Sequence, residues 1–384
     1  MQNALQHLTQ CQEKEAIRLC LKHFRQHNYS EAFETLQKRT KVYLEDELLT
    51  RLHNLLVVNG DFLESERLLE QASHDGLFNN YLRRQLYIPK WTPLSPRSVR
   101  PGMRGGHQMC IDPLAETIYL FGGWDGTKDL ADMWCYHIPN GEWVCLSKDT
   151  GMQGGPSARS CHKMCLDPQR KKIFTLGRYL DQNYRTATNV KSDFYVYDIE
   201  SNKWQLITDD TADMGGPGLV FDHQMCVDSD KNTIYVFGGR VLSATVNDEP
   251  PEGRRTVTPP EQPQFSGLYS YHVPTNRWEK LREERPLLNC SPSSVSLRSR
   301  TGHSMLFHEK SRLLYIFAGQ RQKEYLSDFL TYDIDSKDVT VICDGVDEDV
   351  PAAGFTQRAT IDPELNEIHV LSVSLPLKIL ERMF

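Results

Sequence analysis

Two patterns of apolar and polar residues divide the chain near residue 90. Before that point, apolar residues return every three or four positions, as in the run from Ile17 through Leu21 to Phe24. Beyond residue 104, short runs of about four to eight residues alternate apolar with polar positions. The first spacing is typical of amphipathic helices and the second of half-buried strands. The sequence therefore predicts a small all-α helical module followed by an all-β domain.

Helix start and stop signals subdivide the first module. Ser30 is predicted to be the N-cap of one helix. Another helix is predicted over 45–58, and Asp61 is predicted to cap a third over 62–72, with a further helix over 77–86. Helices this short are marginal alone and need packing partners. The module is therefore either a self-contained bundle or a dimerisation element that buries apolar residues against a second chain.

A sequence unit recurs four times in the second region. Its first half occupies 104–123, 158–177, 220–239 and 299–319, and in each copy a histidine lies 15 positions before a glycine or an alanine. Its second half has a tyrosine, followed seven positions later by tryptophan or, in the fourth copy, by valine. Four alternating runs in each unit, joined by hairpin-type turns, predict the four-stranded antiparallel blades of a β-propeller. The recurring residues are His107, Gly122, Gly123, Tyr136 and Trp143; His162, Gly177, Tyr197 and Trp204; His223, Gly238, Gly239, Tyr271 and Trp278; and His303, Gly319 and Tyr332.

The blades are expected at about 104–147, 158–208, 219–282 and 299–343, with a partial fifth at 354–375. The fifth unit has two strand-like runs and no tyrosine and tryptophan pair. An incomplete ring leaves a free strand edge and an exposed face between blades. We therefore interpret the chain as a truncated form of a longer propeller. The alternative is a four-blade ring that closes with the extra strands as a latch.

The recurring residues are expected to be structural. Each histidine is expected to make the same hydrogen bond inside its own blade, because four equivalent copies would be spread around the ring rather than gathered at one centre. Glycine allows positive φ and close approach of a neighbouring backbone, and tyrosine and tryptophan can fill the space between blades. We therefore predict no catalytic residue, no cofactor and no metal site.

Composition narrows the classes of partner. The ten cysteines contain no CxxC pair, and Cys110, Cys165 and Cys226 fall inside strand patterns. Such buried thiols suit a reducing compartment and do not have zinc-site spacing. The net charge of −7 is mixed along the chain, which argues against nucleic acid. No apolar run reaches the roughly 20 residues that span a bilayer, and 1–10 lacks a signal pattern. We expect a cytoplasmic protein that also enters the nucleus.

The order of histidine, paired glycine, tyrosine and tryptophan resembles the kelch motif over residues 104–373. Two departures are Arg178 at the second glycine position of the second unit and Ala318 at the first of the fourth. The resemblance implies a kelch-type β-propeller that binds proteins. Some kelch-like propellers are metal oxidases, but the candidate ligands here do not cluster on one face. A cytoskeletal or membrane-traffic linker is the alternative to an adaptor.

The N-terminal region carries two further resemblances. The run at 16–37 resembles a LisH dimerisation motif, and the run at 49–91 resembles a CTLH segment. We accordingly assign 1–42 to a LisH-like motif, 43–92 to a CTLH-like segment, 93–103 to a linker and 104–384 to the propeller. The LisH resemblance implies a dimerisation role for Leu19, Leu21, Phe24, Tyr29, Phe33 and Leu36.

LisH, CTLH and kelch segments in this order resemble the muskelin family. Members of that family also carry a discoidin-type domain, six kelch repeats and a C-terminal tail. The resemblance implies an intracellular subunit of the CTLH RING-type E3 ubiquitin ligase complex. Its helices would serve oligomerisation or assembly, and its propeller would bind partner proteins. The partners so implied are CTLH ligase subunits, a second copy of the chain, and cytoskeletal or trafficking proteins.

Overall fold

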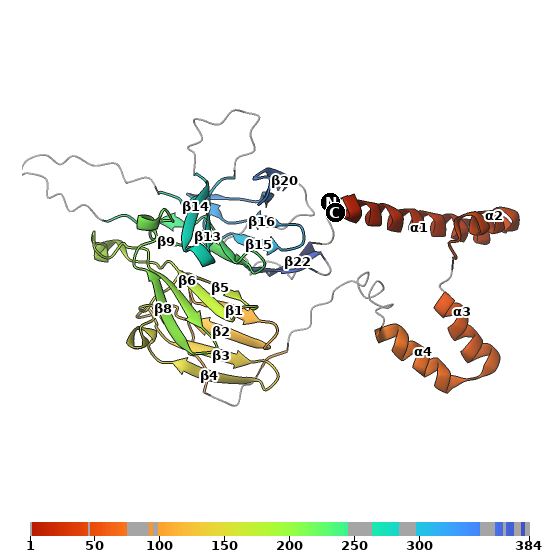
Figure 1. Cartoon of the computed structure of the whole chain (residues 1–384), viewed down its shortest axis with the longest axis horizontal. Coiled ribbons are helices and arrows are strands. Elements are labelled where there is room, and N and C mark those ends of the chain that lie inside the picture. The colour runs from red at the N-terminus through yellow and green to blue at the C-terminus, as the bar shows by residue number, and fades with distance from the viewer. Residues whose placement is uncertain are drawn as a thin grey trace, which may run out of the picture. The chain divides into compact units, whose positions relative to one another are not determined.

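The computed structural model describes residues 2–44, 47–74, 92–94, 99–244, 263–283, 297–345, 358–363, 366–371 and 378–380. The chain divides into two compact units, Met1–Ile88 and Pro89–Phe384. The first is helical and the second is built of β-sheets (Figure 1). A small helical region followed by a β-propeller is the predicted fold class, which is confirmed. The helix predicted over 77–86 lies outside the described residues.

The helical unit consists of short amphipathic helices. Helices α1 (Gln2–Gln26) and α2 (Ser30–Thr40) pack against each other, while α3 (Glu47–His53), a π-helical turn η1 (Asn54–Asn59) and α4 (Phe62–His74) follow. The single helix predicted over 45–58 is therefore a helix and a π-turn, which ends at Gly60 in the left-handed conformation (φ 66°).

Two predicted helix caps have different outcomes. Asp61 caps α4, because its Oδ1 accepts a hydrogen bond from the Glu64 amide at 3.1 Å. The Ser30 prediction is wrong by one residue: Tyr29 is the N-cap of α2, without a side-chain cap, and its carbonyl accepts the first helical bond from the Phe33 amide. The left-handed turn at Asn28 (φ 56°) already places Ser30 inside the helix.

Four sheets of four antiparallel strands form the blades, each in simple sequential order. Blade 1 contains β1 (Gln108–Asp112), β2 (Thr117–Phe121), β3 (Met133–His137) and β4 (Glu142–Ser147). Blade 2 contains β5 (Lys163–Asp167), β6 (Lys172–Leu176), β7 (Phe194–Asp198) and β8 (Lys203–Thr208). Blade 3 contains β10 (Gln224–Asp228), β11 (Thr233–Phe237), β13 (Leu268–His272) and β14 (Arg277–Arg282). Blade 4 contains β15 (Ser304–His308), β16 (Leu313–Phe317), β19 (Phe329–Asp333) and β20 (Val339–Cys343).

Smaller elements complete the propeller unit. Two short strand pairs lie in loops, β9 (Val220–Phe221) with β12 (Arg240–Val241) and β17 (Gln320–Arg321) with β18 (Glu324–Tyr325). Single 3-10 turns are η2 (Thr150–Gln153), η3 (Gln182–Tyr184), η4 (Ala212–Met214) and η5 (Val273–Thr275). A fifth sheet has three strands, β21 (Arg358–Asp362), β22 (Glu367–Leu371) and β23 (Lys378–Leu380). The sequence predicted two strands here, and Lys378–Leu380 forms a third.

Neighbouring blades pack through their faces, and their first strands contact one another around the axis. Each of three interfaces buries a cluster of aromatic and aliphatic side chains, for example Phe121 of blade 1 with Trp204 of blade 2. Burial of such apolar area is the main stabilising contribution in a repeat architecture of this kind.

Within the described residues, no other blade covers the opposite face of blade 1. Met109 and Ile111 of β1 are 46% and 51% exposed, whereas Met164 and Leu166, at the same register in β5, are 6% and 8% exposed. Equivalent strand positions are therefore core in one blade and surface in another. This agrees with the expected exposed inter-blade face.

Candidate functional site

The recurring histidines lie between neighbouring blades. The ring of His162 contacts Phe121 of the preceding blade, with centroids 5.0 Å apart, and His303 contacts Phe237 at 5.2 Å. Within the described residues, neither ring nitrogen of His162, His223 or His303 has a hydrogen-bond partner. His162 and His223 therefore do not make the predicted hydrogen bond within their own blades. The imidazole rings of His162 and His303 pack against the preceding blade.

Burial fixes the charge state of these rings. Desolvation lowers the pKa of His162 and His303 well below the ordinary value of 6.5, and lowers the pKa of His223 to about 3. The rings are therefore neutral near pH 7. Among the residues that the structure describes, no group of three or more histidine, cysteine, aspartate or glutamate side chains could hold a metal ion.

The first glycine of each unit lies where the next blade approaches. A Cβ on Gly177 (φ 80°) would be 2.3 Å from the Val220 carbonyl oxygen and 2.7 Å from Cε1 of His223. The amide after this glycine donates to that same carbonyl, from Arg178 to Val220 at 3.1 Å. Because only the amide is used there, arginine replaces the second glycine of the pair without loss of this bond.

The glycine contact also accounts for the other departure from the repeat. Ala318 stands at the first glycine position of blade 4, and in the sequence the following unit has Gln357 in place of the histidine. The alanine Cβ therefore stands in the unit whose successor has no histidine at the recurring position.

The tyrosines and tryptophans pair within a blade and contact the preceding one. Tyr197 and Trp204 have ring centroids 5.0 Å apart, and Tyr271 and Trp278 are 4.9 Å apart. Trp278 also contacts Phe194 of blade 2 at 5.5 Å. In blade 1, Tyr136 and Trp143 pair at 5.1 Å, and in blade 4 Tyr332 is fully buried.

A recurring ion pair was not predicted from the sequence. Arg104 bonds Asp132 at 2.6 Å, Arg159 bonds Asp193 at 2.7 Å, and a third pair is Arg300 with Asp328 at 2.5 Å. Each arginine lies three residues before a recurring histidine, and this spacing is visible in the sequence. Each guanidinium also donates to the carbonyl at the first glycine position of its own unit, at 3.1 to 3.4 Å. The arginine therefore ties the entry of the first strand to the end of the second.

The predicted dimerisation residues of the helical unit differ in how far they are buried. Leu21 is fully buried within this chain, so it is not available to a second chain as predicted. Phe24, Phe33 and Leu36 are half-buried, whereas Leu19 is 64% exposed. Tyr29 is 54% exposed and stacks on His27, with centroids 5.8 Å apart.

A cavity of about 390 Å³ opens in this unit beside the turn between α1 and α2. Its apolar lining comes from Phe24, Phe33, Tyr43 and Leu44, and its polar lining includes Arg25 and Glu34. Tyr43 is 64% exposed at its edge. A pocket that combines aromatic side chains with charged and amide side chains suits a protein segment better than a small polar metabolite.

Comparison with known proteins finds matches to both the helical and the propeller unit. A family model described as Attractin/LZTR1 beta-propeller matches residues 71–287, and one described as Muskelin N-terminus matches residues 1–47. Mei4-dependent protein 6 of Schizosaccharomyces pombe is 26% identical over 365 residues, which cover 94% of this chain and 49% of that protein.

Two other relatives match the propeller. Leucine-zipper-like transcriptional regulator 1 homolog of Drosophila melanogaster is 24% identical over 284 residues, covering 72% of this chain and 25% of that protein. Kelch domain-containing protein 10 of Homo sapiens is 27% identical over 151 residues, covering 39% of this chain and 32% of that protein. The chain thus spans half or less of the length of each of these relatives.

Proposed function

Because the chain belongs to the family of Attractin/LZTR1 β-propellers and carries a muskelin N-terminal segment, we propose that it is a protein-interaction scaffold and not an enzyme. The helical unit mediates self-association or assembly, and the propeller binds partner proteins. A muskelin-like kelch propeller combines these two units in one chain.

The observation that carries this proposal is the cavity of the helical unit, which has aromatic side chains in its lining. Phe24 and Phe33 line it, and both remain half-buried in the isolated chain. A short helical pair gains stability when a second chain covers such side chains. The same residues belong to the LisH-like pattern, so the sequence motif and the geometry point to one surface.

The propeller supports the scaffold proposal in another way. Its recurring histidine, glycine, tyrosine and tryptophan side chains are used in packing between blades. The cysteines Cys110, Cys165 and Cys226 lie in the strands, and burial raises their thiol pKa values, which makes them poor nucleophiles. The recurring motif therefore builds a platform, and the loops are left for partners.

The finer proposal is membership of the CTLH RING-type ubiquitin ligase complex, in the cytoplasm and the nucleus. Among the described residues, no helix is both long and apolar enough to cross a membrane. Affinity purification of the chain with mass spectrometry tests the assignment: ligase subunits in the eluate would support it. Actin or trafficking proteins without ligase subunits would favour the cytoskeletal or membrane-traffic alternative.

Self-association is tested by substitution at the cavity. Phe33→Asp places a carboxylate in the apolar lining, and we expect a shift from dimer to monomer in light scattering, because an unpaired buried charge is costly. Thr35→Asp, at an exposed position of the same helix, is the matched control and should leave the mass unchanged. An unchanged mass for Phe33→Asp, or a monomeric unsubstituted protein, would contradict the dimer proposal.

A further inference from the structure

Five equivalent residues form a ring around the propeller axis. They are the first residues of β1, β5, β10, β15 and β21, and each pairs with the last residue of the second strand in its sheet. Together they line one cavity of about 350 Å³. We call this set the axial ring: Gln108, Lys163, Gln224, Ser304 and Arg358.

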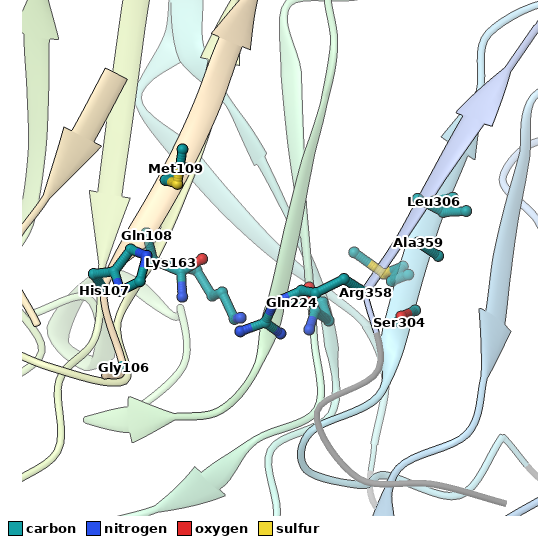
Figure 2. A pocket seen from close by; sticks show the side chains of 11 residues that line it. Gly106, His107, Gln108, Met109, Lys163, Gln224, Ser304, Leu306, Arg358 and Ala359 are labelled. Atoms are coloured by element: carbon teal, nitrogen blue, oxygen red, sulfur yellow. The ribbon is translucent and has the colours of Figure 1, made fainter. Parts of the chain in front are cut away.

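The axial ring is rich in hydrogen-bond donors and contains no acid. Lysine and arginine supply two positive charges, and the side-chain amide of Gln108 can also donate. Figure 2 shows Lys163 and Arg358 extending toward one another from their two strands. Gln224 is held in place because its Nε2 donates to the His303 carbonyl at 2.5 Å. A chain with a net charge of −7 thus gathers cations at its axis.

These two cations lack a direct counter-ion. Within the part of the chain that the structure describes, neither the Lys163 ammonium nor the Arg358 guanidinium forms a salt bridge or a hydrogen bond. One carboxylate, Asp222, interacts electrostatically with both. A single carboxylate can balance only one of the two cations. One positive charge remains unbalanced at the axis.

We propose that the axial ring binds an oxyanion, a phosphate or a carboxylate, through Lys163 and Arg358. Charge-assisted hydrogen bonds from these two groups would hold the anion, with the amide of Gln108 at the same cavity wall. The anion is either free in solution or carried by an acidic segment of a partner protein. In the second case the inference deepens the proposed scaffold function and rests on it.

A purely structural role does not account for Lys163. Its side chain is only 7% exposed, and burial, followed by the charge of Arg358, lowers its pKa to about 8. Glutamine and serine occupy the same register in blades 1, 3 and 4, so a neutral side chain fits there. A buried charge that packing does not require, and that reduces stability, is typical of a binding site.

Titration calorimetry on the whole chain tests the proposal with two probes at constant ionic strength, sodium phosphate and a hexaglutamate peptide. We expect Lys163→Met and Arg358→Gln each to weaken binding at least about tenfold, because each removes a charge-assisted contact. The control Lys231→Met removes the same charge from an exposed turn of blade 3 and should bind like the unsubstituted chain. Thermal unfolding should show no loss of stability for Lys163→Met.

The outcomes separate the two sources of the anion. Binding of phosphate would show that a free anion is sufficient, whereas binding of the peptide alone would show that a protein segment must carry it. The proposal would be overturned if neither probe bound, or if Lys163→Met and Arg358→Gln bound as tightly as the unsubstituted chain. Light scattering on the same variants should show unchanged self-association, so failure here is distinct from failure of the helical interface.

Discussion

Blades 2 and 3 have the same strand order and the same histidine, tyrosine and tryptophan, but they fix the entry of the first strand differently. In blade 2, the fully buried Arg159 donates to both oxygens of Asp193, at 3.0 and 2.7 Å. In blade 3, Val220 and Gly267 stand at the two corresponding positions. The pair is therefore replaced as a unit, and neither charge is left alone.

Blade 3 compensates with apolar contacts. Val220 belongs to β9, which pairs with β12, and it is fully buried with Leu219 and Leu242 beside this strand pair. Its carbonyl still accepts the hydrogen bond from the Arg178 amide of blade 2. The bond between blades thus depends on the position of the backbone, and either an ion pair or an apolar strand pair can provide that position. Replacement of a buried ion pair by apolar residues is often neutral in stability, whereas removal of one partner is not.

The largest effect is expected when only one half of the blade 2 pair is removed. Arg159→Met leaves the Asp193 carboxylate without its partner and the Gly177 carbonyl without a donor. We expect a loss of about 3–5 kcal/mol in the free energy of unfolding, measured by chemical denaturation. Arg277→Met, at an exposed position of β14, is the control and should change stability by less than about 0.5 kcal/mol. A small effect of Arg159→Met would mean that the pair does not hold the blade.

A smaller effect is expected when blade 2 is given the residues of blade 3. The double variant Arg159→Val with Asp193→Gly removes both charges, so no carboxylate is left unpaired. A double-mutant cycle should give a coupling energy of about 2 kcal/mol, with the double variant more stable than Arg159→Val alone. If the losses in unfolding free energy of the two single variants simply add in the double variant, the residues of blade 3 cannot replace the ion pair of blade 2.

The same comparison shows what the sequence could and could not reveal. The repeat of histidine, glycine, tyrosine and tryptophan was sufficient to predict four blades, because each marks a fixed place in a strand. The arginine and aspartate pair was missed because its partners are 28, 34 and 28 residues apart and both are absent from blade 3. The loop between the second and third strands varies in length, so no constant spacing records the contact.

Two further features depend on packing that the amino-acid sequence does not show. The histidines were expected to bond within a blade, but their rings pack on the glycine of the blade before, a contact that exists only once the blades are assembled. The axial ring has four different residue types in its five units, glutamine, lysine, glutamine, serine and arginine, so only strand register identifies it.

The smallest predicted effect concerns acid and the junction between blades 2 and 3. Burial lowers the pKa of His223 to about 3 in the folded state, below its ordinary value of 6.5. The unfolded chain therefore binds the proton first, so this contribution to stability is complete above pH 6.5 and is lost as the pH falls from 6.5 toward 3. Between pH 7.5 and 5.0 we expect His223→Gln to lose about 1–2 kcal/mol less than the unsubstituted chain, as measured by denaturation at both pH values. The control is His272→Gln, at an exposed position of the same blade. Equal pH dependence in all three proteins would mean that protonation of the buried ring does not limit the stability of this junction.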